Sequence, residues 1–207
     1  MEYLDTYDEN KKYLGPKSRE EVHAKGLWHN TVHCWLYDAE GNIYFQIRAD
    51  EKTFYTTASG HVSAGESIKE AFGREINEEI GINIDYEKAE LVDIVVWKMD
   101  KEKANGSIFR DRAFANVYVC LYDNKNEEFT FDDEVDGLVK VNAKAALKLF
   151  TNENGKISAE VITYENGENK KMKCDVDFAE FLVNKHETAL GKYGDVLNKV
   201  IKLTALT

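Results

Sequence analysis

The chain has 207 residues, of which 43% are hydrophobic and 12% are aromatic, so it can form one domain with a sizeable core. Its 27 basic and 38 acidic residues give a net charge of −11, which argues against a nucleic-acid partner and favours a small-molecule one. We expect a cytoplasmic protein without a membrane partner. No apolar run approaches the roughly 20 residues of a membrane span, the N-terminus does not resemble a signal peptide, and the three cysteines lie far apart.

Four strand patterns occupy the first part of the chain. Residues 28–38 and 39–50 predict two strands joined by a turn near Gly41, because apolar runs flank a short polar stretch. Residues 90–100 and 112–123 predict two more strands, the second rich in aromatic and β-branched side chains. The segment between the two pairs holds a motif that is described below.

The segment that follows these strands has a strand pattern first, then a helix pattern, and then turn signals. Residues 136–142 predict a short strand that leads into a helix at 143–150. Asn-Gly pairs at 154 and 166 predict loops and a hairpin between 151 and 174.

The last stretch, from about 175 to 203, predicts a helix or a pair of helices interrupted near Gly191 and Gly194. The apolar residues at helical spacing are Phe178, Phe181, Leu182, Val196, Leu197, Val200 and Ile201. Strands mixed with helices in this way indicate an α/β fold, with a mixed sheet between helical layers.

Residues 67–80 predict a helix, with Ser67 as its N-cap and Gly81 as its C-terminal stop. Its apolar stripe, which should face the core, is formed by Ile68, Ala71, Phe72, Ile76 and Ile80. The helix is therefore amphipathic, and its other faces are free for polar side chains.

Three acids, Glu75, Glu78 and Glu79, converge on a second face near the end of this helix. Their carboxylates repel one another and also oppose the helix dipole. A local rule broken in this way often marks a functional site, and a divalent cation such as Mg²⁺ or Mn²⁺ is the natural compensation. A solvated acidic face without a ligand is the alternative for these three residues alone.

The loop before the helix supports a ligand site. Gly60 and Gly65 bracket a short turn between strand and helix, and a glycine there can point its carbonyl oxygen at a metal. Glu66 and Arg74 are expected to pair and brace the loop against the helix. The helix N-terminus nearby could receive phosphate oxygens.

These residues match a pattern of nine fixed positions, G-x5-E-x7-R-E-U-x-E-E-x-G-U, in which U is a bulky aliphatic residue. The positions are filled by Gly60, Glu66, Arg74, Glu75, Ile76, Glu78, Glu79, Gly81 and Ile82. The chain therefore resembles the Nudix hydrolase superfamily, over roughly residues 28–145. The resemblance implies an α/β/α sandwich that uses Mg²⁺ or Mn²⁺ to hydrolyse a small-molecule diphosphate, such as a nucleoside-diphosphate compound.

The resemblance also implies roles for single residues. The implied metal-binding set is Glu75, Glu79, Glu78 and the carbonyl of Gly60. Arg74 would pair with Glu66 and orient the acids, and Glu78 would act as a further ligand or as a support. We expect one domain over 1–207, in which 151–207 form a C-terminal hairpin and helical extension. Dimerisation is common in the superfamily, so a homodimer stays open.

A narrower resemblance points to the branch that contains isopentenyl-diphosphate isomerases, carried by residues 19–48 and 58–61. Three histidines match metal-binding histidines of the isomerases by position: His23, His29 and His61. Ser59 stands where the isomerases have a catalytic cysteine, and their Glu-x-Glu pair corresponds to Asp111 and Ala113. We therefore expect a hydrolase built on this branch, with an isomerase as the alternative. Whether the histidines bind metal or are structural remnants stays open.

Three charged residues outside the motif are further candidates. Arg110 and Arg112 could bind a substrate phosphate, although an ordinary exposed charge cluster is the alternative. Glu134, just before a short strand, could be the general base, with a solvated loop acid as the alternative. A third possibility for the whole chain is a module that binds a diphosphate ligand without cleaving it, as in Nudix-fold sensors.

Overall fold

The computed structural model of the chain describes residues 1–123, 128–181 and 189–206. In chain order its elements are β1 (Tyr3–Tyr7), β2 (Tyr13–Ser18), α1 (Arg19–Lys25), β3 (Trp28–Tyr37), β4 (Asn42–Arg48), β5 (Phe54–Tyr55), β6 (Ala58–His61), α2 (Ile68–Ile80), β7 (Ala89–Glu102), β8 (Ile108–Leu121), β9 (Val135–Asn142), α3 (Ala143–Asn152), β10 (Lys156–Glu165), β11 (Glu168–Asp177) and α4 (Ala189–Thr204). Short 3-10 turns lie at Tyr86–Lys88 and Phe178–Glu180.

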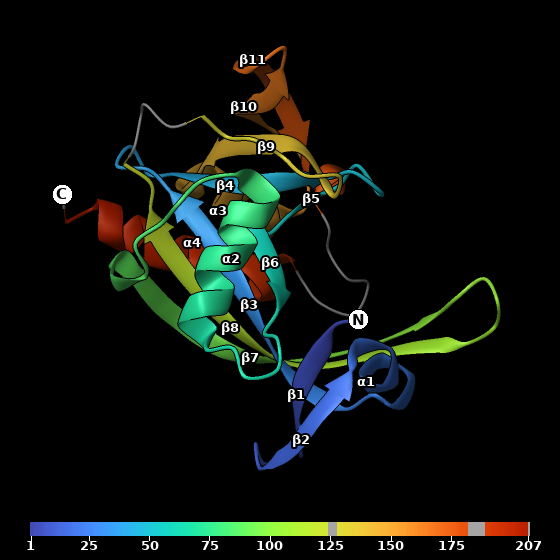
Figure 1. Ribbon diagram of the computed structural model, residues 1–207. Coiled ribbons are helices and arrows are strands. Elements are labelled where there is room, and N and C mark those ends of the chain that lie inside the picture. Colours follow the sequence, from blue (N-terminus) through green and yellow to red (C-terminus); the bar gives the residue numbers. More distant parts are fainter. Residues whose placement is uncertain (124–127, 182–188, 207) are drawn as a thin grey trace.

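The strands form one mixed sheet with the order β11-β10-β9-β4-β3-β1-β2, to which β5, β6, β8 and β7 are attached (Figure 1). The pairing of β3 with β8 is parallel, from His29 beside Ala113 to Tyr37 beside Leu121, whereas its pairing with β6 is antiparallel. Helix α2 covers one face of the sheet, and α3 and α4 cover the other. The expected α/β/α sandwich with a mixed sheet and a C-terminal helix is thus confirmed.

Each face of the sheet has its own apolar core. The side chains of Ala71, Phe72, Ile76 and Ile80 are fully buried beneath α2, and Ile68 packs at the edge, which confirms the expected stripe. The opposite core gathers aromatic rings, including Trp35, Phe45, Phe150 and Tyr193. The sheet is therefore buried on both sides, which holds β3 and β6 rigidly beside α2.

The expected C-terminal helix is wrong in its first part. Strand β11 continues to Asp177, and the rings of Phe178 and Phe181 then pack on Phe150, with centroids 6.1 and 4.9 Å away. The helix itself begins at Ala189 and ends at Thr204, without an interruption at Gly191 or Gly194. The spacing of the apolar residues alone did not distinguish a helical turn from the end of a strand that packs on α3. Leu182 lies outside the described residues.

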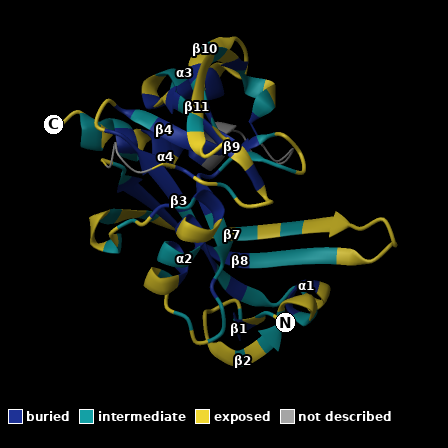
Figure 2. Ribbon diagram, turned by 45° about the horizontal axis from the view of Figure 1, so that its top comes forward, coloured by how far each residue is buried: buried dark blue, intermediate teal, exposed yellow. Residues whose placement is uncertain are grey.

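Two extensions project from the sandwich. The β7–β8 hairpin reaches well beyond the sheet, and its outer part is largely exposed (Figure 2). The N-terminal strands β1 and β2 form a ribbon that joins the sheet where Thr6 pairs with His29. Leu4 is fully buried at the join. Within the described ranges, no helix is both long and apolar enough to cross a membrane.

Candidate active site

Helix α2 begins and ends as its sequence predicts. The Ser67 hydroxyl accepts a hydrogen bond from the Glu70 amide, and the Glu70 carboxylate accepts one from the Ser67 amide at 2.8 Å, which is a capping box. Gly81 ends the helix in the left-handed conformation, with φ of 71°. These local signals fix the register of the helix, so Glu75 and Glu79 point at β6.

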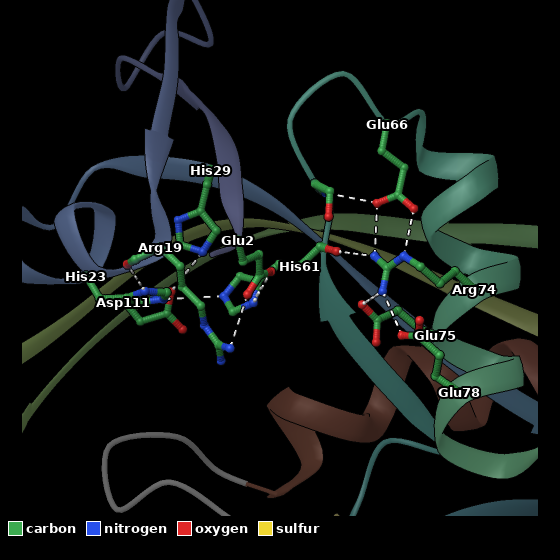
Figure 3. Close-up of polar contacts among 11 residues, drawn as sticks. Glu2, Arg19, His23, His29, His61, Glu66, Arg74, Glu75, Glu78 and Asp111 are labelled. Atoms are coloured by element: carbon green, nitrogen blue, oxygen red, sulfur yellow. Dashed lines mark hydrogen bonds and ion pairs between the residues drawn. The ribbon is translucent and has the colours of Figure 1, made fainter. Parts of the chain in front are cut away.

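Arg74 connects the loop before the helix to the acids of the helix (Figure 3). Its guanidinium group donates two hydrogen bonds to Glu66, at 2.8 and 2.9 Å. It donates one more to Glu75 at 2.7 Å and one to Glu78 at 3.0 Å. A fifth bond, 2.8 Å long, goes to the carbonyl oxygen of His61. One side chain therefore holds three carboxylates and a strand carbonyl in fixed positions.

Glu75 and Glu79 are buried, with 9% and 7% of their surfaces exposed. Burial raises the pKa of Glu75 to about 7, although Arg74 opposes this shift. Burial also raises the pKa of Glu79 well above its usual value. Its Oε2 accepts hydrogen bonds only from neutral groups in the described residues, the Ser59 amide at 3.1 Å and the Gln46 amide at 3.2 Å. Two buried acids with one neighbouring arginine fit a bound divalent cation.

Gly60 lies directly against these acids. A Cβ atom added at this glycine would lie 2.2 Å from the carboxylate carbon of Glu75, so no larger residue fits while Glu75 keeps its place. Carboxylate oxygens with a backbone carbonyl nearby are the hard ligands that Mg²⁺ and Mn²⁺ prefer. The donor set at this end of α2 therefore fits the expected cofactor.

A cavity of about 600 Å³ opens in front of α2. Arg74, Glu75, Glu78 and Glu79 line one side of it, and Glu134 also lines it. None of the described residues that line the cavity is aliphatic. Such a lining suits a charged and hydrophilic ligand rather than an apolar one.

The cationic residues of the cavity differ from those that we expected. Arg110 donates to the Ala24 carbonyl at 2.9 Å, and Arg112 donates to the Met99 carbonyl at 3.0 Å, and neither lines the cavity. The residue between them, Asp111, does. Because side chains alternate between the two faces of a strand, Asp111 points to the opposite face from Arg110 and Arg112. This alternation is the signal that could have identified Asp111 as a cavity residue.

Two other arginines line the cavity, and sequence reasoning missed both. Arg48 follows Gln46 by two residues on β4, so the alternation of that strand places it on the same face as the Glu79 contact. Arg19 begins α1. No local signal marks Arg19, because only the fold of the N-terminal ribbon brings it to the cavity.

Three histidines form a second cluster beside the cavity (Figure 3). One ring nitrogen from each of His23, His29 and His61 lies within 4.8 Å of the others. Asp111 Oδ1 lies 3.5 Å from His29 Nε2, and both atoms are buried without a hydrogen-bond partner among the described residues. Burial lowers the pKa of His61 to about 2 and lowers those of His23 and His29. Neutral imidazoles beside a carboxylate with one buried oxygen fit a transition-metal ion.

Known proteins resemble this chain over most of its length. A family model described as the NUDIX domain matches residues 27–161. An uncharacterized Nudix hydrolase from Clostridium acetobutylicum is 34% identical over 195 residues, covering 89% of this chain and 92% of the relative. An isopentenyl-diphosphate Delta-isomerase from Serratia proteamaculans is 26% identical over 129 residues, covering 60% of this chain and 68% of that enzyme. A crystallised Deinococcus radiodurans protein shares the fold, with a TM-score of 0.52 and 20% identity, over 73% of this chain and 89% of that one.

Proposed function

We propose, because this chain belongs to the Nudix hydrolase family, that it hydrolyses the diphosphate linkage of a small molecule with Mg²⁺ or Mn²⁺ as its cofactor. Compounds of the nucleoside-diphosphate type are the substrate class that we would test first. The observation that carries the proposal is the pair of buried acids, Glu75 and Glu79, at the wall of a polar cavity beside Arg74.

The metal ligands that we propose come from both sides of one strand-to-helix connection. Glu75, Glu79 and the carbonyl oxygen of Gly60 would hold the ion, with Glu78 as a further ligand or a support. The bound ion supplies positive charge that neutralises phosphate oxygens and lowers the pKa of a water molecule. Arg74 holds the acids in place before substrate arrives, which reduces the reorganisation that the reaction requires.

Glu134 is our candidate for the general base. It lines the cavity, and its backbone is tied down because the Ala49 amide donates to its carbonyl at 2.8 Å. A carboxylate held there can take a proton from the attacking water. For the phosphate groups we propose Arg19 and Arg48, whose planar guanidinium groups suit phosphate oxygens.

A screen of diphosphate compounds with Mg²⁺, Mn²⁺ or EDTA tests the proposed function. We expect cleavage between phosphorus atoms only with metal, and loss of cleavage in Glu75→Gln. Glu102→Gln, at the exposed outer end of β7, is the matched control and should retain full turnover. Binding of a diphosphate by folded protein without any turnover would instead support the ligand-binding module.

The histidine cluster supports a second metal centre. We propose that the Nε2 atoms of His23, His29 and His61, with the carboxylate of Asp111, hold a divalent transition-metal ion. The two unpartnered buried atoms, His29 Nε2 and Asp111 Oδ1, are the observation that supports it, because such groups are costly unless something binds them.

The same cluster keeps the isomerase as a second candidate function, since the Serratia relative carries that name. Two observations favour hydrolysis over it. Ser59 lines the cavity where the isomerases have a cysteine, and a hydroxyl is a far weaker acid than a thiol. An isomerase must also bind an apolar five-carbon chain, and none of the described residues that line the cavity has an aliphatic side chain. Proton exchange into isopentenyl diphosphate, followed by NMR, should stay at background. Catalysed exchange would favour the isomerase.

A further inference from the structure

The histidine centre has an outer layer of contacts that set which ring nitrogen carries the proton. His23 Nδ1 lies 2.8 Å from the Arg19 carbonyl oxygen, and His29 Nδ1 lies 3.1 Å from that of Leu27. A carbonyl oxygen only accepts hydrogen bonds, so both Nδ1 atoms must be protonated. Both Nε2 atoms are therefore free of protons, with their lone pairs directed at the centre.

Among the described residues, no carbonyl oxygen is hydrogen-bonded to a ring nitrogen of His61, and its tautomer depends on two competing neighbours. Its Nε2 lies 3.3 Å from His23 Nε2, so an Nε2–H form could donate a hydrogen bond to that nitrogen. Its Nδ1 instead faces Oε1 of Glu2 (Figure 3), and these atoms are 3.7 Å apart, which is an ion-pair distance and not a hydrogen bond. A carboxylate only accepts, so Glu2 favours the Nδ1–H form. Only that form leaves the third Nε2 free for a metal.

The fold holds Glu2 firmly in this position. The Arg19 amide donates to the Glu2 carbonyl at 3.0 Å, and the Ala64 amide donates to the next residue, Tyr3, at 2.8 Å. The Arg19 side chain binds the other carboxylate oxygen of Glu2 at 3.2 Å, which leaves Oε1 for His61. The N-terminal ribbon thus places Oε1 of Glu2 beside Nδ1 of His61.

We propose that Glu2 is the positioning residue of the histidine centre. The charge of its carboxylate, whose Oε1 lies 3.7 Å from His61 Nδ1, favours a proton on that nitrogen and therefore the tautomer in which three Nε2 atoms converge on one divalent transition-metal ion. This inference rests on the proposed metal binding by the histidines. It makes the N-terminal ribbon, which lies outside the matched family region of 27–161, a part of the functional site.

Histidine-selective ¹⁵N NMR tests the tautomer directly, without metal and without turnover. In the metal-free parent, the His61 signal should show a protonated Nδ1. In Glu2→Ala the proton should move to Nε2, where it bonds to His23. Glu2→Gln retains a carbonyl acceptor, so it should lie between the two. An unchanged Nδ1–H tautomer in Glu2→Ala would overturn the proposal.

Zn²⁺ titration by calorimetry, with the same NMR signals assigning the site, tests the consequence. We expect Glu2→Ala to weaken Zn²⁺ binding at the histidines roughly 10- to 100-fold. Glu9→Gln alters an exposed acid of the same ribbon, so this control should bind within about twofold of the parent.

Two other results of this titration would contradict us in distinguishable ways. If the parent shows no Zn²⁺-induced change in its histidine signals, the metal centre itself is wrong. If the parent binds Zn²⁺ and Glu2→Ala binds equally well, or if Glu9→Gln weakens binding as much as Glu2→Ala does, then the centre stands and the role of Glu2 is wrong.

Discussion

Arg74 donates a 2.8 Å hydrogen bond to the carbonyl oxygen of His61, and this bond links the acidic cluster of α2 to the histidine cluster. The ring of His61 lies among the histidines, while its backbone lies beside Gly60 and the acids. The two clusters therefore share a short strand, β6, to which Arg74 is hydrogen-bonded. A substitution of Arg74 should therefore alter the geometry of both the acidic cluster and the histidine cluster.

Replacing Arg74 by lysine removes the planar fork that serves five hydrogen bonds at once. A lysine has three rotatable donors and cannot pair with Glu66 through two parallel bonds. We expect Arg74→Lys to lose about 1–3 kcal/mol of unfolding free energy in urea, and to lose turnover by at least ~10²-fold. Arg110→Lys, which alters a single bond to a backbone carbonyl, is the control and should stay close to the parent in both measurements.

Replacing Glu79 by glutamine should have opposite effects on stability and on activity. At a pH high enough to ionise both acids, the variant lacks a negative charge that faces Glu75 and opposes the helix dipole, so metal-free protein should then gain about 0.5–1 kcal/mol. It also loses a proposed ligand, so Mn²⁺ should raise its melting temperature less than that of the parent, and turnover should fall by at least ~10²-fold. Equal metal-induced shifts and full activity would show that Glu79 is not a metal ligand.

Replacing Gly60 by alanine should displace a side chain without unfolding the protein. The added methyl group meets the end of the Glu75 side chain, which can move away. We therefore expect a folded variant whose turnover is reduced at least ~10-fold, because a preorganised carboxylate is shifted. In Gly73→Ala, on the same helix, the new Cβ has no neighbour within 4 Å. That control should retain turnover and gain about 1 kcal/mol of stability from its better helix propensity. A fully active Gly60→Ala would contradict the proposed site.

Stability without metal should fall as the pH rises through 7. Burial raises the pKa of Glu75 from 4.5 to about 7, so between these values the folded chain holds a proton that the unfolded chain has released. This contribution is complete below pH 4.5 and is lost as the pH rises past 7. Glu79 acts in the same direction. In EDTA, the melting temperature of the parent relative to Glu75→Gln should therefore drop between pH 5.5 and 8. A constant difference would mean that Glu75 is not perturbed.

The parts of the site that lie close together in the sequence were predictable from it. Ser67, Gly81 and the apolar stripe fixed the helix, and the acids and Arg74 follow from its periodicity. The pairing of Arg74 with Glu66 also spans only eight residues. These features depend on one helix and the loop before it, and helical geometry transfers directly from sequence to structure.

The parts that depend on long-range pairing were not predictable in the same way. Strand β1 has a polar sequence and becomes ordered by contacts such as the bridge between Leu4 and Ser63, which are 59 positions apart in sequence. Glu2 and Arg19 reach the site only because this ribbon folds back on the loop before α2. For Arg110 and Arg112, the strand was expected only from residue 112, whereas β8 begins at Ile108. The alternation of side chains across Arg110, Asp111 and Arg112 was therefore not considered.

The most direct test of the central claim is ³¹P NMR of the reaction in ¹⁸O-enriched water, comparing the parent with Glu75→Gln/Glu79→Gln on any diphosphate that the screen identifies. The isotope shift reveals which phosphorus atom received the water oxygen. We predict that the parent with Mg²⁺ or Mn²⁺ places ¹⁸O on one of the two phosphorus products, and that the double variant does so at least ~10²-fold more slowly. Equal rates of ¹⁸O incorporation by a folded double variant, or cleavage by the parent that continues unchanged in EDTA, would contradict the assignment of the chemistry to the acids of α2.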